Sequence, residues 1–262
     1  MHTLRIVVAY KGTHYYGWQD LGSNEQKPTV QGCIHQALKK ICKYQDCIVS
    51  GASRTDAGVH ALGQVAKLTV PMDIKPLNLQ MGLNALLPDD IRVTQCRACP
   101  LWFNPNRGAI SKEYHYYFSV GSVANPLLSD IVTHITPAGE PLTCDPININ
   151  KMKDACQLFI GTHDFYSFAT RDASVRSTQR TISQCEIVLS NFSELNGDVY
   201  SLRMSGDGFL KHMVRYISGA LIKLARGELD LSQISEALQA RQEKKLAPKS
   251  KAKGLHLISI NY

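Results

Sequence analysis

The chain has 262 residues, of which 44% are hydrophobic and 19% are charged. This composition excludes a disordered chain, and the length suits one large domain or two closely packed ones with a buried core. The formal net charge of +7 comes from 29 basic and 22 acidic residues, a balance that is compatible with many functions. Because Met1 leads directly into a strand-like segment and no apolar run reaches membrane-spanning length, we expect a cytoplasmic protein without a signal peptide or a membrane partner.

The first half of the sequence predicts an α+β layer in which helices pack on a sheet. Apolar residues recur at helical spacing between residues 30 and 41, and a second helix is predicted at 76–87, before Pro88. Strand-like apolar runs occur at residues 4–10, 47–51, 61–70 and 90–96. The order strand, helix, strand, strand, helix, strand is typical of an α+β fold.

The second half repeats this mixture of sheet and helix. Residues 112–120 alternate in a way that predicts a strand with two distinct faces, and residues 121–147, with four prolines and no period, predict a long connector. Helices are predicted at 149–161, 210–224 and 231–238, strands at 181–190, 198–206 and 256–262, and a polar-aromatic loop at 162–174. We therefore divide the chain into two α+β halves, 1–105 and 106–262, which share no close sequence repeat.

The eight cysteines predict reduced and mostly buried thiols. Cys96 and Cys99 form a CxxC pair, but the sequence has no second such pair and no pair of histidines nearby. Four zinc ligands are therefore not available, and we expect no metal site.

Basic residues crowd a short stretch before the final strand. They are Arg241, Lys244, Lys245, Lys249, Lys251 and Lys253. A cluster of this kind attracts a polyanion electrostatically. The alternative is a solvated surface loop, because charge runs are common on protein surfaces, and the charges alone leave both interpretations open.

The stretch SGASRTDAGVHALGQVA, residues 50–66, places Arg54 and Asp56 in a tight corner between two strands. Taken alone, this stretch predicts a turn, since Asp and Gly are ordinary turn formers. The segments YYGWQ, KEYHYYF and GFLKHMVRYISG also carry polar or aromatic groups beside apolar structure. Together with TVQG, LNALLPDDIRV, GTHDFYSF and KGLHLISINY, these segments resemble the tRNA pseudouridine synthase A family nearly end to end.

The resemblance implies two related α+β halves whose antiparallel sheets join into one curved sheet, with helices packed outside and a central basic cleft. It also implies a homodimer that presents two such clefts to tRNA, and no metal or organic cofactor. The expected enzyme is an isomerase that converts uridine to pseudouridine in the anticodon stem-loop, at positions thirty-eight to forty of tRNA.

Asp56 matches the family's nucleophile in RTDAG and is the candidate catalytic residue. A carboxylate can attack or stabilise the electron-poor sugar carbon, or remove the neighbouring sugar proton, and the sequence leaves these routes open. An ionised carboxylate that is shielded from water needs a partner, and Arg215 matches the residue that pairs with the nucleophile in the family. By helical spacing alone, Arg215 lies off the apolar stripe and is expected to be exposed.

The target uridine must leave its stack before it reacts. By its match in the motif, Arg54 would fill the vacated space and grip phosphate with its planar guanidinium. Tyr114 would lie against the flipped uracil and relay a proton, although it reads equally as a core tyrosine. Lys244, Lys245 and Lys249 are the candidate phosphate contacts.

Other residues receive smaller roles. His60 is interpreted chiefly as a hydrogen-bonded structural residue, and three residues are expected to line the RNA path without taking part in the chemistry: Lys112, Phe165 and Phe168. The sequence departs from the usual family pattern at Lys11, Ser53 and Asn106-Arg107. These departures bear on which uridines are chosen and not on the reaction.

Two other functions fit part of the pattern. A non-catalytic tRNA-binding protein on the same fold would have the same charge and aromatic residues. The joint presence of Asp56, Arg54 and Arg215 favours the enzyme, because a pure binder does not require them. A glycosidase with paired carboxylates would need a second acid, and none is obvious near Asp56.

Overall fold

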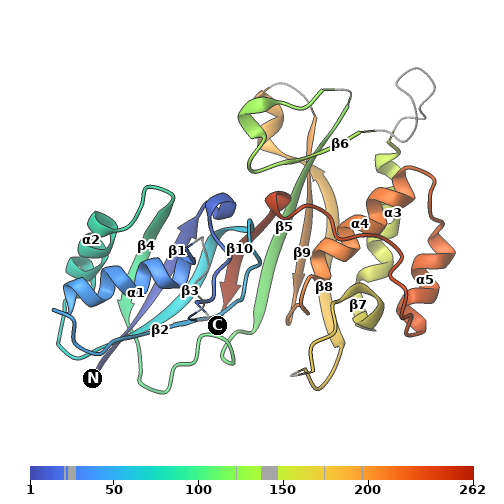
Figure 1. The fold of residues 1–262 in the computed structure, drawn as a ribbon. Helices are drawn as coiled ribbons and strands as arrows, with labels where there is room; N and C mark the ends of the chain where they lie inside the picture. Colours follow the sequence, from blue (N-terminus) through green and yellow to red (C-terminus); the bar gives the residue numbers. More distant parts are fainter. Residues whose placement is uncertain (21, 23–27, 122, 137–146, 174, 196–197) are drawn as a thin grey trace. The chain divides into compact units, whose positions relative to one another are not determined.

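The computed structural model describes the chain except residues 21, 23–27, 122, 137–146, 174 and 196–197. The described part is a mixed α+β protein with five α-helices, and its strands pair mostly antiparallel. It divides into two compact units (Figure 1). The first unit comprises Met1–Ile110 with Leu257–Tyr262, and the second comprises Ser111–His256.

The first unit is built on antiparallel strands. They are β1 (His2–Tyr10), β2 (Ile48–Gly51), β3 (His60–Val70) and β4 (Ile91–Ala98), and β10 (Leu255–Asn261) follows β3 in the strand order. β1 lies between β4 and β3, and β2 pairs with β3. The side chains of Leu4, Ile6 and Val8 alternate with more exposed neighbours and are buried, as expected for a strand with one face on the core.

Two helices cover this sheet. α1 (Val30–Ile41) begins at Thr29, whose hydroxyl oxygen accepts a hydrogen bond from the Gly32 amide at 3.1 Å and caps the helix. α2 (Pro76–Leu86) has proline at its first position, where no intrahelical amide bond is lost. The two helices contact each other, and each turns its buried apolar residues inward.

The second unit contains further paired strands. They are β5 (Ser111–Val120), β6 (Thr133–Ile135), β7 (Gly161–Asp164), β8 (Gln179–Leu189) and β9 (Val199–Gly206). The order β5-β9-β8-β7 is antiparallel throughout, and β6 pairs parallel with β5. Tyr114 on β5 lies opposite Met204 on β9.

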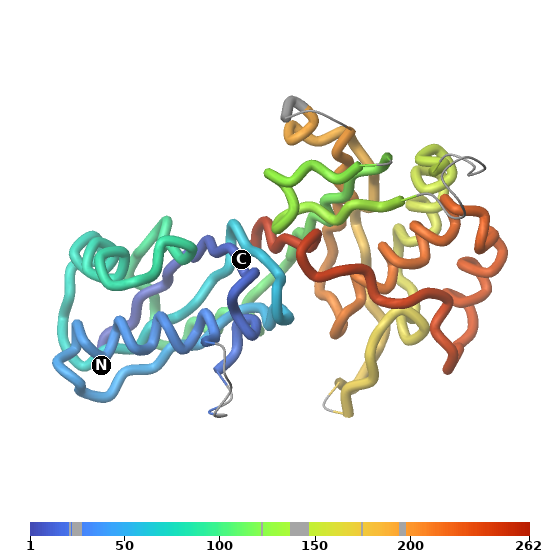
Figure 2. The backbone as a smooth tube through the Cα atoms, turned by 45° about the horizontal axis from the view of Figure 1, so that its top comes forward, coloured from blue at the N-terminus to red at the C-terminus, as the bar shows by residue number. Residues whose placement is uncertain are grey.

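Three helices complete the second unit, α3 (Ile149–Cys156), α4 (Met213–Ala225) and α5 (Leu231–Gln239). Figure 2 shows them gathered on one side of that unit's strands. α5 begins with a capping box between Asp230 and Gln233, and Gly227, just after α4, has a φ of +71°, which favours glycine. α5 lies where it is predicted, whereas the helix predicted at 149–161 ends at Cys156 and is followed by a 3-10 turn at Gln157–Phe159.

The structure corrects further details of the predicted elements. Part of the connector at 121–147 is ordered, with a 3-10 turn at Pro126–Leu128 and the strand β6, while residues 122 and 137–146 lie outside the described part. The strand β7 begins at Gly161, at the end of the predicted helix, and runs into the loop predicted at 162–174; it is too short to show a period of its own and is fixed by pairing with β8. The helix predicted from Leu210 begins at Met213, because His212 has a φ of +64°.

The chain ends in the first unit, because Leu257–Tyr262 group with it. The predicted division, 1–105 and 106–262, instead places these six residues in the C-terminal half. Whether the two halves are functional domains stays a prediction. The cysteines in the described part of the chain are free thiols, and Cys144 lies outside that part.

Candidate active site

Asp56 lies in the loop 52–59 that joins β2 to β3 in the first unit. The Val59 amide donates to the Asp56 carbonyl oxygen at 3.1 Å, which closes a short turn, and Gly58 in this turn has a φ of +77°. The side chain of Asp56 is half-buried. Because β2 and β3 are themselves paired, the carboxylate comes from a loop whose two ends are fixed by the sheet.

Thr55 anchors this loop to the core. It is buried, and its Oγ1 is hydrogen-bonded to the hydroxyl of Tyr10 at 2.7 Å. Its carbonyl oxygen accepts from the Trp18 amide at 3.1 Å. The Trp18 ring in turn packs on Gly51, where a Cβ would lie 2.1 Å from the indole nitrogen. Any side chain at position 51 would therefore displace the ring that supports the loop.

Gln64 provides a second anchor, one that sequence reasoning missed. Its side chain is fully buried, its Oε1 accepts from the Ser53 amide at 3.1 Å, and its Nε2 donates to the Ser53 carbonyl oxygen at 2.6 Å. A buried amide requires such partners. The sequence did carry one signal, a glutamine in the middle of an apolar strand. A side-chain amide buried at such a position needs hydrogen-bond partners, and backbone groups can provide them.

The loop 11–20 packs against the Asp56 loop. The Gly12 amide donates to Nδ1 of His60 at 3.1 Å, which supports the structural interpretation of this histidine. A Cβ at Gly12 would lie 1.9 Å from the Val59 carbonyl oxygen, so only glycine permits this approach. The two loops therefore hold each other in place.

Asp90 ties down the loop 11–20 from the start of β4. The Lys11 amide donates to the Asp90 carbonyl oxygen at 2.9 Å, and the Tyr15 hydroxyl donates to the Asp90 carboxylate. Burial, together with the bond to Asp90, raises the pKa of Tyr15 well above its usual value. Tyr15 therefore stays a protonated donor, and the side chain of Lys11 is left exposed at the surface.

Arg54 is exposed between two buried neighbours, Ser53 and Thr55. Successive side chains of an extended segment point to opposite sides, so the two anchors direct Arg54 away from the core. Ser53, one of the departures from the family pattern, is buried and contributes backbone to the Gln64 anchor. Asn106 and Arg107, which also depart from the pattern, are exposed. Their backbone amides donate hydrogen bonds to Oδ1 of Asn104.

Tyr114 lies on β5 in the second unit and is 7% exposed. Its ring meets that of Phe209 edge to face, with 5.0 Å between ring centroids. Tyr116 and Phe118 on the same face are each 1% exposed, and the Tyr116 hydroxyl is bonded to Thr133 and to the Lys251 carbonyl oxygen. These two residues belong to the core, and Tyr114 lies at its edge.

Arg215 lies in the first turn of α4 and is half-buried, so the expectation of ordinary exposure was wrong. Its Nε donates to the Ser250 carbonyl oxygen at 2.9 Å, and the Ser250 amide donates back to the Arg215 carbonyl oxygen at 3.0 Å. His212, which precedes the helix, is a non-glycine residue in the left-handed region, and its Nδ1 is hydrogen-bonded to Oγ1 of Thr170 at 2.7 Å. Backbone of this kind is uncommon and gathers at functional sites.

The lysine cluster, residues 244–253, divides into exposed and bound side chains. Lys244, Lys249 and Lys251 are exposed. Lys245 is half-buried and its Nζ donates to the Tyr166 carbonyl oxygen at 2.8 Å, while Nζ of Lys253 donates to the Ser129 carbonyl oxygen at 2.6 Å. Burial lowers the pKa of Lys245.

The three residues expected along the RNA path differ. Phe165 and Phe168 are at most 1% exposed and belong to the core of the second unit, so that expectation was wrong for them. Their aromatic side chains stabilise the fold and are not available to RNA. Lys112 is half-buried, and burial together with the charge of Arg180 lowers its pKa to about 8.

Cys96 lies on β4 and Cys99 follows that strand. Burial raises the pKa of Cys96 to about 11, with a further contribution from Cys99, and burial also raises the pKa of Cys99. Both thiols therefore stay protonated at neutral pH.

Asp56 and Arg54 thus share one loop of the first unit, and the second unit carries Tyr114, Arg215 and the lysine cluster. The family model described as tRNA pseudouridine synthase matches residues 6–105 and 155–262, which include the RTDAG loop and the helix of Arg215. The chain belongs to the tRNA pseudouridine synthase family.

Relatives of this family match over the full length. The chain is 50% identical to tRNA pseudouridine synthase A 2 of Desulfotalea psychrophila, covering 99% of this chain and 98% of that protein. It is 34% identical to tRNA pseudouridine synthase A of Ruminiclostridium cellulolyticum, covering both chains completely at 100%. A crystal structure of a Cbf5-Nop10-Gar1 complex aligns with 97% of this chain, about half (48%) of that chain, at 12% identity and a TM-score of 0.36. No helix in the described ranges is long and apolar enough to cross a membrane.

Proposed function

We propose that this protein is a tRNA pseudouridine synthase that isomerises uridine to pseudouridine in the anticodon stem-loop, at positions thirty-eight to forty. The observation that carries the reaction is the family match, because it spans both the loop of Asp56 and the helix of Arg215. The full-length likeness to relatives named tRNA pseudouridine synthase A supports tRNA as the substrate. The choice of the anticodon stem-loop rests on the resemblance of the sequence motifs.

Asp56 is the proposed catalytic residue. The reaction breaks the bond between uracil and ribose, rotates the base and joins it again through carbon. Asp56 either forms a bond to the sugar carbon or removes the neighbouring sugar proton. Its support is local: the buried Thr55 and the bonds from Gln64 to Ser53 hold the backbone just before a carboxylate that is half-buried.

Arg215 and Tyr114 are proposed to assist the same nucleotide. Arg215 would balance the charge of Asp56 when RNA excludes water, a role that suits a half-buried guanidinium tied to the Ser250 carbonyl oxygen. Tyr114 would stack against the uracil, which suits a ring at the edge of the core better than the fully buried Tyr116. Arg54 would occupy the space left by the flipped base.

The remaining proposals concern the whole protein. A curved sheet shared by the two halves, a central basic cleft and a homodimer follow from the resemblance to the family. Action in the cytoplasm agrees with the free thiols found among the described residues, since reducing compartments keep cysteines unpaired.

The test is to incubate unmodified tRNA with the protein and to map pseudouridine at nucleotide resolution. Wild type should form pseudouridine in the anticodon arm. Asp56→Asn, which keeps the shape of the side chain and loses its charge, should form none and should bind tRNA within a few-fold of wild type. A near-normal single-turnover rate in Asp56→Asn would remove Asp56 from the mechanism. Wild type that binds tRNA without forming pseudouridine would support the non-catalytic alternative.

A further inference from the structure

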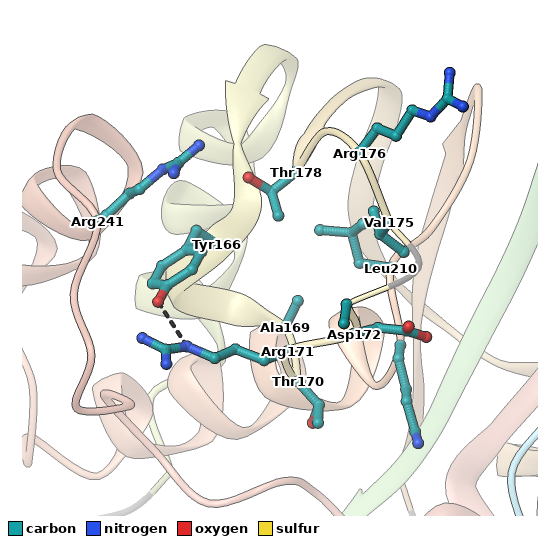
Figure 3. A pocket seen from close by; sticks show the side chains of 12 residues that line it. Tyr166, Ala169, Thr170, Arg171, Asp172, Val175, Arg176, Thr178, Leu210 and Arg241 are labelled. Carbon is teal, nitrogen blue, oxygen red and sulfur yellow. Dashed lines mark hydrogen bonds between the residues drawn. The ribbon is translucent and has the colours of Figure 1, made fainter.

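A basic pocket of about 430 Å³ lies in the second unit (Figure 3). It is lined by residues within 166–173 and 175–178, by Leu210 and Lys211 just before α4, and by Arg241. Four basic side chains line it, those of Arg171, Arg176, Lys211 and Arg241. Its size falls in the range of small-ligand sites. We call it the Tyr166 pocket, after the aromatic residue in its wall.

Tyr166 gathers several of the positive charges. The guanidinium carbons of Arg171 and Arg241 lie 5.5 and 5.3 Å from the centre of its ring, and Nζ of Lys245 lies at 5.3 Å. The Tyr166 hydroxyl accepts from Nε of Arg171 at 2.7 Å and donates to Glu243 at 2.7 Å. Cation–π attraction and this hydrogen bond hold like charges close together, an arrangement that favours an anionic ligand.

Acidic residues balance only part of this charge. Arg171 pairs with Glu243, and Arg241 pairs with Asp164 at 2.8 Å. Among the residues that the structure describes, no carboxylate lies within ion-pair distance of the exposed side chains of Arg176 and Lys211, although Asp172 also lines the pocket. Two positive charges therefore remain for a ligand.

Apolar side chains lie beside these charges. Figure 3 shows Arg176 across the pocket from Arg241, next to Val175 and Leu210. Charged groups on the wall of a partly apolar pocket suit a ligand that carries both a phosphate and an apolar surface. A nucleotide has these properties, and phosphate contacts position RNA without reading its sequence.

We propose that the Tyr166 pocket binds a phosphodiester group of the tRNA substrate, with Arg176 and Lys211 as the phosphate contacts. Tyr166 holds Arg171 and Arg241 in place, and Leu210 and Val175 contact the attached sugar or base. This inference rests on the proposed function, because it takes tRNA as the ligand. It assigns the pocket to anchoring and not to the chemistry.

The experiment compares Arg176→Gln/Lys211→Gln with a matched control, Lys151→Gln/Lys153→Gln, which removes two exposed charges from α3. Binding of unmodified tRNA is measured over a range of salt concentrations. The pocket variant should flatten the plot of log affinity against log salt by roughly 0.7–0.9 for each lost phosphate contact, and the control should not. Ethylation of single tRNA phosphates should weaken binding to wild type at one or two positions, and the pocket variant should no longer be sensitive there.

The outcomes separate this inference from the proposed function. If wild type forms pseudouridine and the pocket variant raises KM while keeping kcat, the anchoring role is supported. If the salt slopes of the pocket variant and its control are equal, the pocket is not a phosphate site, whatever the reaction. If wild type forms no pseudouridine, the proposed function fails, and the salt slopes still decide whether the pocket contacts RNA phosphate.

Discussion

Arg54 is the most exposed of the residues proposed to act near the reacting nucleotide, and its buried neighbours direct it into solvent. This placement favours a role for Arg54 in binding the RNA and flipping the base, before the bond between uracil and ribose is broken. If Arg54 fills the gap left by the flipped base, it lowers the cost of extrusion, which amounts to a few kcal/mol and is least for an unpaired base.

Arg54→Ala should therefore slow the reaction most on a uridine held in a base-paired stem. A substrate whose target uridine is unpaired by a mismatch should recover part of the lost rate. The measurement is single-turnover pseudouridine formation by wild type and variant on matched and mismatched anticodon arms. Equal losses on both substrates would reject the flipping role and favour a role in orienting Asp56.

Lys112 allows a prediction about pH. Its pKa is lowered to about 8, whereas an unfolded lysine titrates near 10.4, so between these values the unfolded chain binds more protons than the folded one. The destabilising effect of Lys112 is therefore complete below about pH 8 and disappears as the pH rises toward about 10.

Lys112→Met should unfold at higher urea concentration than wild type at neutral pH. This advantage should shrink as the pH rises through the window above, because wild type gains stability there. Urea unfolding of both proteins over this range measures the difference, and Lys151→Met, on the exposed face of α3, serves as the control. A difference that stays constant with pH would show that the Lys112 amine is not perturbed by its surroundings.

At the scale of elements, the lysine cluster contains side chains with two different roles. Lys245 and Lys253 bond to backbone carbonyl oxygens of the second unit, whereas Lys244, Lys249 and Lys251 are exposed. Lys244 and Lys249 also line a second pocket of about 740 Å³ together with Tyr216. The exposed lysines are thus the ones free to contact RNA.

Replacing Lys244, Lys249 and Lys251 with Gln should lower the salt dependence of tRNA binding by roughly 0.7–0.9 in slope for each lost contact. The matched control replaces three exposed lysines of the first unit, Lys39, Lys40 and Lys75. Binding titrations at several salt concentrations provide the measurement. A slope equal to that of the control would leave the cluster as a solvated loop.

At the scale of the whole molecule, the proposed chemistry draws on both units. Asp56 belongs to the first unit and Arg215 to the second. If Arg215 balances the carboxylate, its positive charge favours the ionised form of Asp56 in the complex with RNA. The pH dependence of the reaction then reports on a residue of the other unit.

Arg215→Met should lower kcat/KM and shift the acid limb of its pH profile to higher pH, whereas Arg215→Lys should shift it less because the charge is kept. Arg203→Met is the control, since Arg203 faces Glu186 on the neighbouring strand. Profiles of kcat/KM against pH for the four proteins make the comparison. An acid limb at the wild-type position in Arg215→Met would mean that Arg215 acts through the fold and not through charge.

The sequence by itself determined most of the elements and singled out the residues of interest. Helical spacing located α1, α4 and α5, and alternation located β5, because burying one face of a helix or strand imposes a period on the apolar residues. The motif around Asp56 was recognised from the order of residues along the chain. β7 was missed because four residues carry no period, and its pairing with β8 stabilises it instead.

Only the tertiary structure decided how these residues are held. Two residues anchor the Asp56 loop from neighbouring strands. Tyr10 comes from β1, far from the motif in the sequence, and Gln64 lies within the motif's own stretch, but the sequence does not show that its side chain binds the Ser53 backbone. Burial likewise separated the core residue Phe165 from Arg54 at the surface, although both lie in motifs of the same family. A hydrogen bond between distant segments, and the solvent excluded around it, depend on packing in three dimensions, and the spacing of residues along the chain does not contain that information.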